Sequence, residues 1–174
     1  MKNFKEHLHK VKAFAFDVDG VLSTEAIPLS PDGEPMRVIN TKDGYALKQA
    51  VVCGFPVAII TGGNTQAVRT RFESLGIQDI YMGSCYKLDK LQHFMEKYGL
   101  KPEEILFMGD DIPDYETLKY VGVPTCPSDA VSEIKEICCY VSNRKGGEGC
   151  GRDVIEQVLK LNGKWMHNVE AFGW

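Results

Sequence analysis

The feature that most constrains the fold of this chain is a short apolar segment that ends in two carboxylates. Residues 11–16 read Val-Lys-Ala-Phe-Ala-Phe, a run that predicts a buried strand. Asp17 and Asp19 follow with one residue between them, and Gly20 offers a turn. Because residues two apart on a strand point the same way, we expect both carboxylates at the carboxyl end of a central strand, where open α/β sheets place their active sites.

Two close carboxylates repel each other unless a cation or a proton lies between them. The pair at Asp17 and Asp19 therefore indicates a hard metal ion, a shared proton, or both. The same Asp-x-Asp-Gly pattern occurs in ordinary turns and in calcium loops, although Val21 stands where a third calcium ligand would be. The pattern alone leaves a functional and a structural interpretation open.

Length and composition fit one globular domain spanning residues 1–174, with 44% hydrophobic and 25% charged residues. A net charge of −4 without a basic patch disfavours a nucleic-acid partner. No apolar run approaches the roughly 20 residues that span a bilayer, and the charged segment 1–10 lacks the apolar core of a signal peptide. These features predict a cytoplasmic protein with no membrane partner.

Strand and helix patterns alternate along the chain. Further strands are expected at 55–60, 79–82, 104–108, 121–126 and 137–141. Helices are expected at 43–52, from Asn64 or Thr65 to Leu75, at 88–98, after Pro113, at 131–136 and at 152–161. The alternation predicts a Rossmann-like α/β fold, a doubly wound parallel sheet with helices on both faces. Residues 21–41, with the turn Pro31-Asp32-Gly33, predict a projecting β-hairpin.

Polar residues follow other predicted strands as well. In chain order they are Thr61 with Gly62, Lys87, and the acids Asp110, Asp111 and Asp114. Each has a structural alternative. Thr61 and Gly62 suit a strand-to-helix turn, the acids suit helix capping, and Lys87 suits a solvated helix face, with Lys90 as the alternative for its role.

Taken together and in order, these residues resemble the four motifs of the haloacid dehalogenase superfamily. The motifs appear here as Asp17-Val-Asp19-Gly20, Ile60-Thr61-Gly62, Lys87 and 109–114, and they cover nearly the whole domain. The resemblance implies a Mg²⁺ ion held by Asp17, Asp110 and the backbone carbonyl of Asp19. It also implies that Asp111 and Asp114 orient these ligands or their waters.

The resemblance further implies the roles of the remaining residues. Asp17 would attack phosphorus to give an aspartyl-phosphate, and Asp19 would act first as acid and then as base. Thr61 and Lys87 would hold the phosphoryl oxygens. Asp19 indicates a phosphatase or phosphomutase, because the dehalogenases of the superfamily lack an acid there and its ion-pumping ATPases carry Thr. The spacings from Asp19 to Thr61 and from Thr61 to Lys87 leave no room for a cap domain.

Additional segments resemble the 3-deoxy-D-manno-octulosonate 8-phosphate phosphatases and their nonulosonate relatives. These segments are 42–44, 68–71, 75–77, 110–114 and 146–149. The resemblance implies hydrolysis of a sugar-acid phosphate, as in lipopolysaccharide biosynthesis, by a capless homotetramer. Candidates for binding the anionic substrate are Gly62, Arg69, Arg71 and Arg152.

Two departures from that pattern, at 24–26 and 150–153, put the particular sugar in doubt. A nonulosonate 9-phosphate phosphatase therefore stays open, as does a non-catalytic oligomerisation module related to acylneuraminate cytidylyltransferase domains. The tail, 163–174, carries Trp165, Phe172 and Trp174, and such anchors are enriched at interfaces. We expect the hairpin, with the tail as a second candidate, to cover a partner's site; packing of the tail on its own subunit is the alternative.

Overall fold

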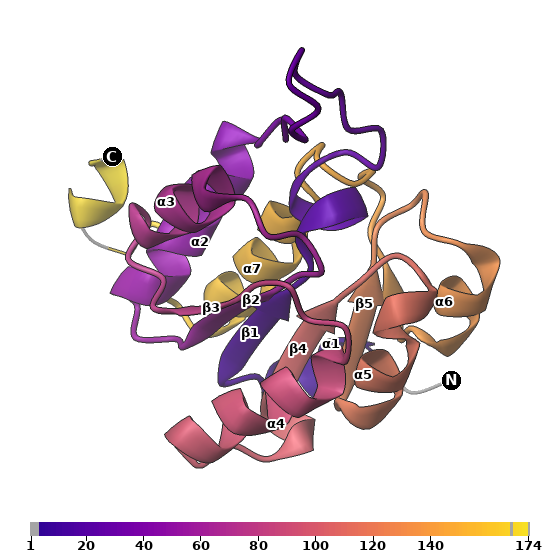
Figure 1. Ribbon diagram of the computed structural model, residues 1–174. Helices are drawn as coiled ribbons and strands as arrows, with labels where there is room; N and C mark the ends of the chain where they lie inside the picture. The colour runs from indigo at the N-terminus through magenta and orange to yellow at the C-terminus, as the bar shows by residue number, and fades with distance from the viewer. Residues whose placement is uncertain (1–3, 168, 174) are drawn as a thin grey trace.

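The computed structural model describes residues 4–167 and 169–173. A six-stranded sheet in the order β3-β2-β1-β4-β5-β6 forms its centre, and every strand pair is parallel. The strands are β1 (Ala13–Phe16), β2 (Val57–Ile60), β3 (Asp79–Tyr81), β4 (Ile105–Met108), β5 (Val123–Cys126) and β6 (Tyr140–Val141). The predicted doubly wound parallel sheet is confirmed (Figure 1).

Helices cover both faces of this sheet. They are α1 (Phe4–Leu8), α2 (Thr41–Val52), α3 (Gln66–Glu73), α4 (Lys87–Tyr98), α5 (Tyr115–Tyr120), α6 (Ser132–Ile137) and α7 (Cys150–Leu161). Short helical turns lie at η1 (Val18–Leu22), η2 (Pro102–Glu104), η3 (Ile112–Asp114) and η4 (Val169–Phe172). The sequence patterns predict α2 to α7 within a few residues. Helix α1 was not predicted, and η1 contains the turn expected at Gly20.

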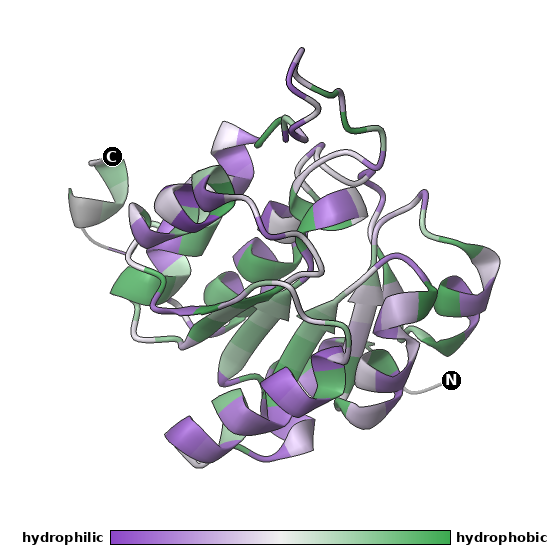
Figure 2. Ribbon diagram, viewed as in Figure 1, coloured by the Kyte–Doolittle hydropathy of each residue, from purple (hydrophilic) through white to green (hydrophobic). Residues whose placement is uncertain are grey.

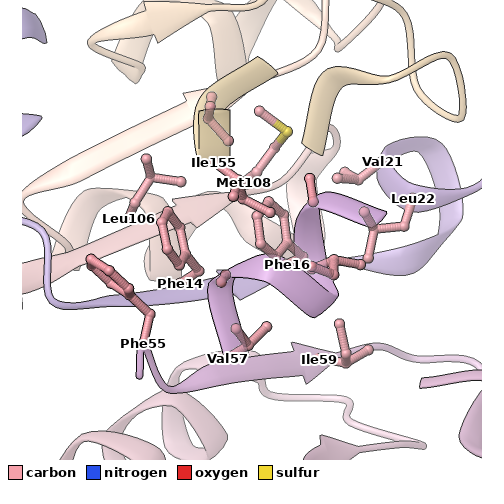
Figure 3. Packing of buried hydrophobic residues seen from close by; sticks show 14 of the residues in the cluster. Phe14, Phe16, Val21, Leu22, Phe55, Val57, Ile59, Leu106, Met108 and Ile155 are labelled. Atoms are coloured by element: carbon pink, nitrogen blue, oxygen red, sulfur yellow. The ribbon is translucent and has the colours of Figure 1, made fainter. Parts of the chain in front are cut away.

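The alternation of side chains along β1 explains how the two helical layers are held. Phe14 and Phe16 face one layer, where α1, α2, α3 and α7 pack. Ala13 and Ala15 face the other, where α4, α5 and α6 bring larger side chains such as Phe94. Figure 3 shows the phenylalanines packed among Val57, Leu106 and Ile155. Figure 2 shows the same pattern as apolar strands between helices with hydrophilic outer faces. Burial on both faces accounts for the continuous apolar runs of these strands.

The connections place the carboxyl end of β1 at a change of winding direction. The chain passes from β1 to β2 and β3 on one side, then returns to β4 on the other side of β1. Such a switch point leaves a crevice beyond the strand ends, where ligands bind in open α/β sheets. Asp17 and Asp110 lie just past the two strands that flank it.

The segment between β1 and α2 forms the predicted projecting hairpin, seen in Figure 1 beyond the sheet. Its arms are joined by isolated bridges, Ser23 to Ile39 and Leu29 to Pro35. Its prolines supply no backbone N–H for a ladder, which keeps the pairing discontinuous.

The connections near the site are too short to hold a cap domain. Only η1 and the hairpin lie between β1 and α2, and only α3 and β3 lie between β2 and α4, so residues 4–167 contain no cap domain.

The described part of the tail packs on its own chain. The Trp165 ring meets the Tyr45 ring edge-on at 5.8 Å, and the Tyr45 hydroxyl donates a hydrogen bond to the Ala171 carbonyl. Phe172 is exposed, and Trp174 lies outside the described residues. None of the described helices has the length and apolar character needed to cross a bilayer.

Candidate active site

A buried lysine joins two of the predicted acids at the switch point. Asp17 follows β1, and one of its carboxylate oxygens accepts a hydrogen bond of 2.6 Å from the Val18 N–H. Its other oxygen lies 2.7 Å from Lys87 Nζ, which is also 2.7 Å from Asp114 Oδ1. Lys87 begins α4 and its side chain is 5% exposed. Lys90, the alternative for its role, is exposed on the same helix.

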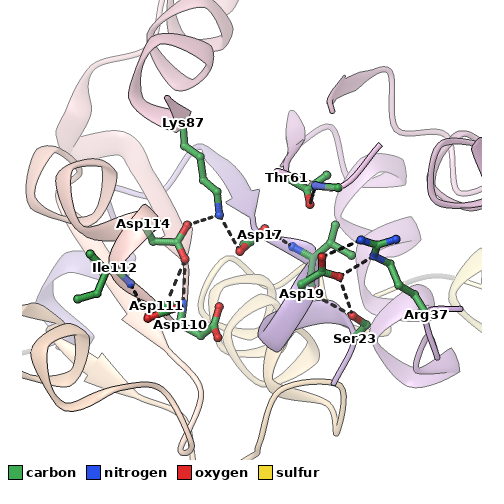
Figure 4. Close-up of polar contacts among 12 residues, drawn as sticks. Asp17, Asp19, Ser23, Arg37, Thr61, Lys87, Asp110, Asp111, Ile112 and Asp114 are labelled. Atoms are coloured by element: carbon green, nitrogen blue, oxygen red, sulfur yellow. Dashed lines mark hydrogen bonds and ion pairs between the residues drawn. The ribbon is translucent and has the colours of Figure 1, made fainter. Parts of the chain in front are cut away.

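Asp110 and Asp114 complete an acidic cluster after β4. The other Asp114 oxygen accepts hydrogen bonds from the N–H groups of Asp110 at 3.0 Å and Asp111 at 3.4 Å. Oxygen atoms of Asp17, Asp110 and Asp114 all lie within 4.8 Å of one another (Figure 4). Gly20, at φ 78°, is required beside them, because a Cβ there would collide with the Asp110 carboxylate. This spacing suits an oxygen-liganded divalent cation.

The pKa values of the clustered acids also indicate a site for a cation. Burial raises the pKa of Asp17 to about 7, and repulsion from Asp114 adds to the rise while Lys87 opposes it. Burial, followed by the charges of Asp17 and Asp114, raises the pKa of Asp110 to about 8. Burial alone would lower the pKa of Lys87, but the two carboxylates beside it raise it instead. One lysine therefore does not neutralise three crowded acids, and a cation would favour their ionised forms.

Thr61 and Gly62 form the second wall of the cavity. The Thr61 side chain is buried just past β2, and its oxygen accepts a hydrogen bond of 3.1 Å from the Gly63 N–H. This open turn leads into α3, as the sequence predicts. Thr61, Gly62, Asp17, Lys87 and Asp110 line one cavity of about 460 Å³. A volume of this order is typical of small-molecule sites.

Asp19 lines the same cavity, and its carboxylate is hydrogen-bonded to Arg37, a residue that the sequence analysis did not identify. Its Oδ1 accepts from Arg37 Nε at 2.6 Å, and its Oδ2 accepts from Arg37 Nη2 at 2.8 Å. Arg37 comes from the returning arm of the hairpin, eighteen residues later in the chain. The register of a proline-rich hairpin is not readable from composition or spacing, so no sequence pattern pointed to Arg37.

The remaining predicted residues lie away from the cluster or turn from it. Asp111 is exposed on the cavity rim and caps its own turn through the Ile112 N–H at 2.8 Å. Arg69 donates to the Ile80 carbonyl at 3.2 Å, and Arg71 lies on α3, outside the cavity lining. The guanidinium of Arg152 lies over the Trp165 ring, with Cζ 5.2 Å from the ring centroid. The structure brings none of these three arginines to the cavity of its own chain, so their substrate-binding role stays a prediction.

The fold and this site define a phosphohydrolase: a carboxylate, a buried lysine, a strand-end hydroxyl and an acidic cluster meet at the switch point of a parallel sheet. Residues 45–122 match the haloacid dehalogenase-like hydrolase family. The chain is 34% identical to the 3-deoxy-D-manno-octulosonate 8-phosphate phosphatase KdsC of Salmonella typhi over 154 residues, which cover 88% of this chain and 82% of that protein. The chain belongs to this family of haloacid dehalogenase-like hydrolases and is a phosphoric monoester hydrolase.

Solved structures agree with that assignment. The 3-deoxy-D-manno-octulosonate 8-phosphate phosphatase of Moraxella catarrhalis, in complex with magnesium ion, phosphate ion and KDO, superposes with a TM-score of 0.89 at 30% identity, covering 94% of this chain and 95% of that one. The corresponding phosphatase of Yersinia pestis gives a TM-score of 0.90 at 29% identity, covering 94% and 88%. The resemblance inferred from the motifs is thereby confirmed at the level of family and fold.

Proposed function

We propose that this protein is a Mg²⁺-dependent phosphatase that hydrolyses 3-deoxy-D-manno-octulosonate 8-phosphate through an aspartyl-phosphate at Asp17. The observation that carries the proposal is the convergence of Asp17, Lys87 and Asp110 at one strand-end cavity. The named activity of relatives 34% identical to this chain supports the choice of substrate.

The donor set of this chain fits magnesium. Mg²⁺ prefers carboxylate, carbonyl and water oxygens, and carboxylate oxygens of Asp17, Asp110 and Asp114 lie within 4.8 Å of one another. We assign Asp17, Asp110 and the backbone carbonyl of Asp19 as ligands, with Asp111 and Asp114 orienting them or their waters. Asp114 is well suited to this task, because it also fixes Lys87 at 2.7 Å. When bound, the ion offsets the negative charge of the phosphate and of the attacking carboxylate.

In the first half-reaction, Asp17 attacks phosphorus and the bond from phosphorus to the sugar oxygen breaks. Asp19 gives its proton to that leaving oxygen. Lys87 and Thr61 hold the phosphoryl oxygens as charge develops, and preorganised donors of this kind contribute most when they are buried. Both side chains are buried here.

In the second half-reaction, Asp19 takes a proton from a water molecule that attacks phosphorus. The bond from phosphorus to the Asp17 oxygen breaks, which restores the free carboxylate and releases inorganic phosphate. Asp19 suits proton exchange better than Asp17, because its side chain is 33% exposed and reachable from the cavity.

A panel of phosphate monoesters tests the proposal. We expect Mg²⁺-dependent phosphate release, fastest with the octulosonate phosphate and slower with nonulosonate 9-phosphates, hexose phosphates and aryl phosphates. A preference for a nonulosonate 9-phosphate would change the proposed substrate but not the proposed reaction. Absence of hydrolysis with every member of the panel would favour the oligomerisation module instead.

We also propose a cytoplasmic homotetramer in which the hairpin contacts a neighbouring subunit. Leu29, Met36 and Val38 of the hairpin are exposed large apolar residues, of the kind that anchor interfaces. Sedimentation of the full chain, compared with a chain ending at Asn162, tests the assembly and the part played by the tail. A monomer with full activity would refute a shared site.

A further inference from the structure

Arg37 has contacts that a solvated surface arginine would not make. Besides its two bonds to Asp19, its Nη1 donates to Thr65 Oγ1 at 2.5 Å, and its side chain is only 7% exposed. All three guanidinium nitrogens are therefore engaged by the side chains of Asp19 and of Thr65, the residue just before α3. A bidentate pair of this kind fixes the plane as well as the position of a carboxylate.

The neighbouring backbone leaves room for this guanidinium. A Cβ placed on Gly63 would lie 2.5 Å from Arg37 Nη2, so a side chain at position 63 would displace the arginine. Gly63 also lines the cavity with Asp19. Arg37 thus lies between the hairpin and the Thr61 turn, and its guanidinium links the hairpin and Thr65 to Asp19 (Figure 4).

The two oxygens of Asp19 are not equally occupied. Oδ1 accepts from Arg37 Nε and also lies 3.3 Å from the Ser23 hydroxyl, whereas Oδ2 accepts from Arg37 Nη2. A carboxylate oxygen offers about two lone-pair positions. Within the described part of the chain, Oδ2 therefore keeps one position for a proton that travels to or from a ligand.

We propose that Arg37 is a positioning residue that fixes the Asp19 carboxylate and leaves Oδ2 to exchange the proton with the leaving group and the attacking water. The inference rests on the proposed function, because it assumes that Asp19 is the acid and base. Arg37 acts through Asp19 and is not itself a catalytic residue. Since it is carried by the hairpin, proton transfer requires the hairpin to be folded over the site of its own chain.

Steady-state kinetics of Arg37→Ala, Arg37→Lys and wild type test the proposal with two substrates. Protonation of the leaving oxygen matters for the octulosonate phosphate and much less for para-nitrophenyl phosphate, whose leaving group is good. We expect kcat of Arg37→Ala to fall about 10- to 100-fold on the sugar phosphate, with KM nearly unchanged and a far smaller loss on the aryl phosphate. Arg37→Lys should recover part of the loss. Arg144→Ala, which removes an exposed arginine elsewhere, is the matched control and should leave both activities unchanged.

Coupling to Asp19 gives the decisive readout. If Arg37 acts through Asp19, adding Arg37→Ala to Asp19→Asn should cost less than about twofold more. Equal losses on both substrates, a raised KM with unchanged kcat, or additive effects in the double variant would overturn the proposal. Gly63→Ala, which keeps Arg37 but displaces it, should reproduce the substrate-dependent loss even if Arg37→Ala fails to fold. A wild-type protein inactive on every phosphate monoester would instead refute the proposed function.

Discussion

Two networks meet at the cavity, and they are built differently. The Asp17, Lys87 and Asp114 network is buried, with side chains 1% to 9% exposed, and strands and helix starts supply its members. The Asp19 and Arg37 pair is partly open, with Asp19 33% exposed, and one member comes from a hairpin held by isolated bridges. The first network is fixed by sheet topology, whereas the second depends on how an irregular segment folds back.

The difference separates two tasks of the proposed reaction. Attack on phosphorus needs a nucleophile, cation ligands and a lysine in fixed positions, which a rigid sheet edge provides. Proton exchange needs access to ligand and water, which the more exposed Asp19 provides. Substitutions in the buried network should therefore affect every substrate alike, and those in the hairpin network should depend on the leaving group.

Removing the nucleophile should have the largest effect. We expect Asp17→Asn to lower kcat by at least about 10⁴-fold on sugar and aryl phosphates alike, since no substrate can bypass the covalent step. The circular dichroism spectrum should stay that of the wild type, because the amide fills the same volume. Substantial turnover by the purified variant, or by wild type stripped of divalent metal, would contradict a metal-dependent nucleophile.

Loss of the buried lysine should come next. Lys87→Met leaves Asp17 and Asp114 without their shared cation, and we expect kcat to fall about 10²- to 10³-fold on both substrates. Lys90→Met, one turn along the same helix and exposed, is the matched control and should behave as wild type. A larger loss of kcat in Lys90→Met than in Lys87→Met would assign the binding of the phosphoryl oxygens to Lys90.

Substitution of Asp19 should sharpen the contrast between the networks. Asp19→Asn removes the proton carrier but keeps the backbone carbonyl, so calorimetry should still detect Mg²⁺ binding. We expect about a 10²-fold loss of kcat on the sugar phosphate and a smaller loss on aryl phosphates. Equal losses on both would make Asp19 a structural residue and would remove the distinction between the two regions.

The smallest expected effect is on stability. Without metal, the raised pKa values of Asp17, about 7, and Asp110, about 8, mean that the folded state keeps protons that the unfolded state has released. The free energy of unfolding should therefore fall as pH rises through these values. Burial also raises the pKa of Asp43 to about 6, which lowers the free energy of unfolding in the same way but at lower pH. The change in stability between pH 6 and 8 therefore reports mainly on Asp17 and Asp110.

Thermal melts measure this effect. Across that window we expect the melting temperature of the metal-free protein to fall by an amount on the order of several degrees, and Mg²⁺ to raise it more at pH 8 than at pH 6. Asp110→Asn should flatten the profile. A metal-free melting temperature that rises from pH 6 to 8 would contradict the electrostatic description of the cluster.

The same division explains what could be predicted from sequence. Asp17, Thr61, Lys87 and Asp110 each follow a buried strand or begin a helix, and a parallel sheet brings all such positions to one edge. Their convergence could therefore be predicted from periodicity and order. Arg37 could not, because its approach to Asp19 depends on the register of a hairpin that has few backbone hydrogen bonds.

The directions of the arginine side chains could not be predicted from the sequence either. Arg69 and Arg71 were predicted to bind the anionic substrate from their charge and from the family resemblance of segment 68–71, and the structure shows Arg69 bonded to the Ile80 carbonyl. Arg152 is drawn to aromatic rings of the tail and of α2. Long flexible side chains settle on whichever partner the tertiary fold brings closest, which a linear pattern does not encode.

The central claim is that Asp17 carries the phosphoryl group between the two half-reactions. Acid quenching of the Mg²⁺-loaded protein within milliseconds of mixing with the octulosonate phosphate, followed by digestion and mass spectrometry, tests it most directly. We predict a transient phosphoryl group on Asp17 that is absent from Asp17→Asn and persists longer in Asp19→Asn. Turnover without any phosphorylated peptide, or with the phosphoryl group on another residue, would contradict the mechanism.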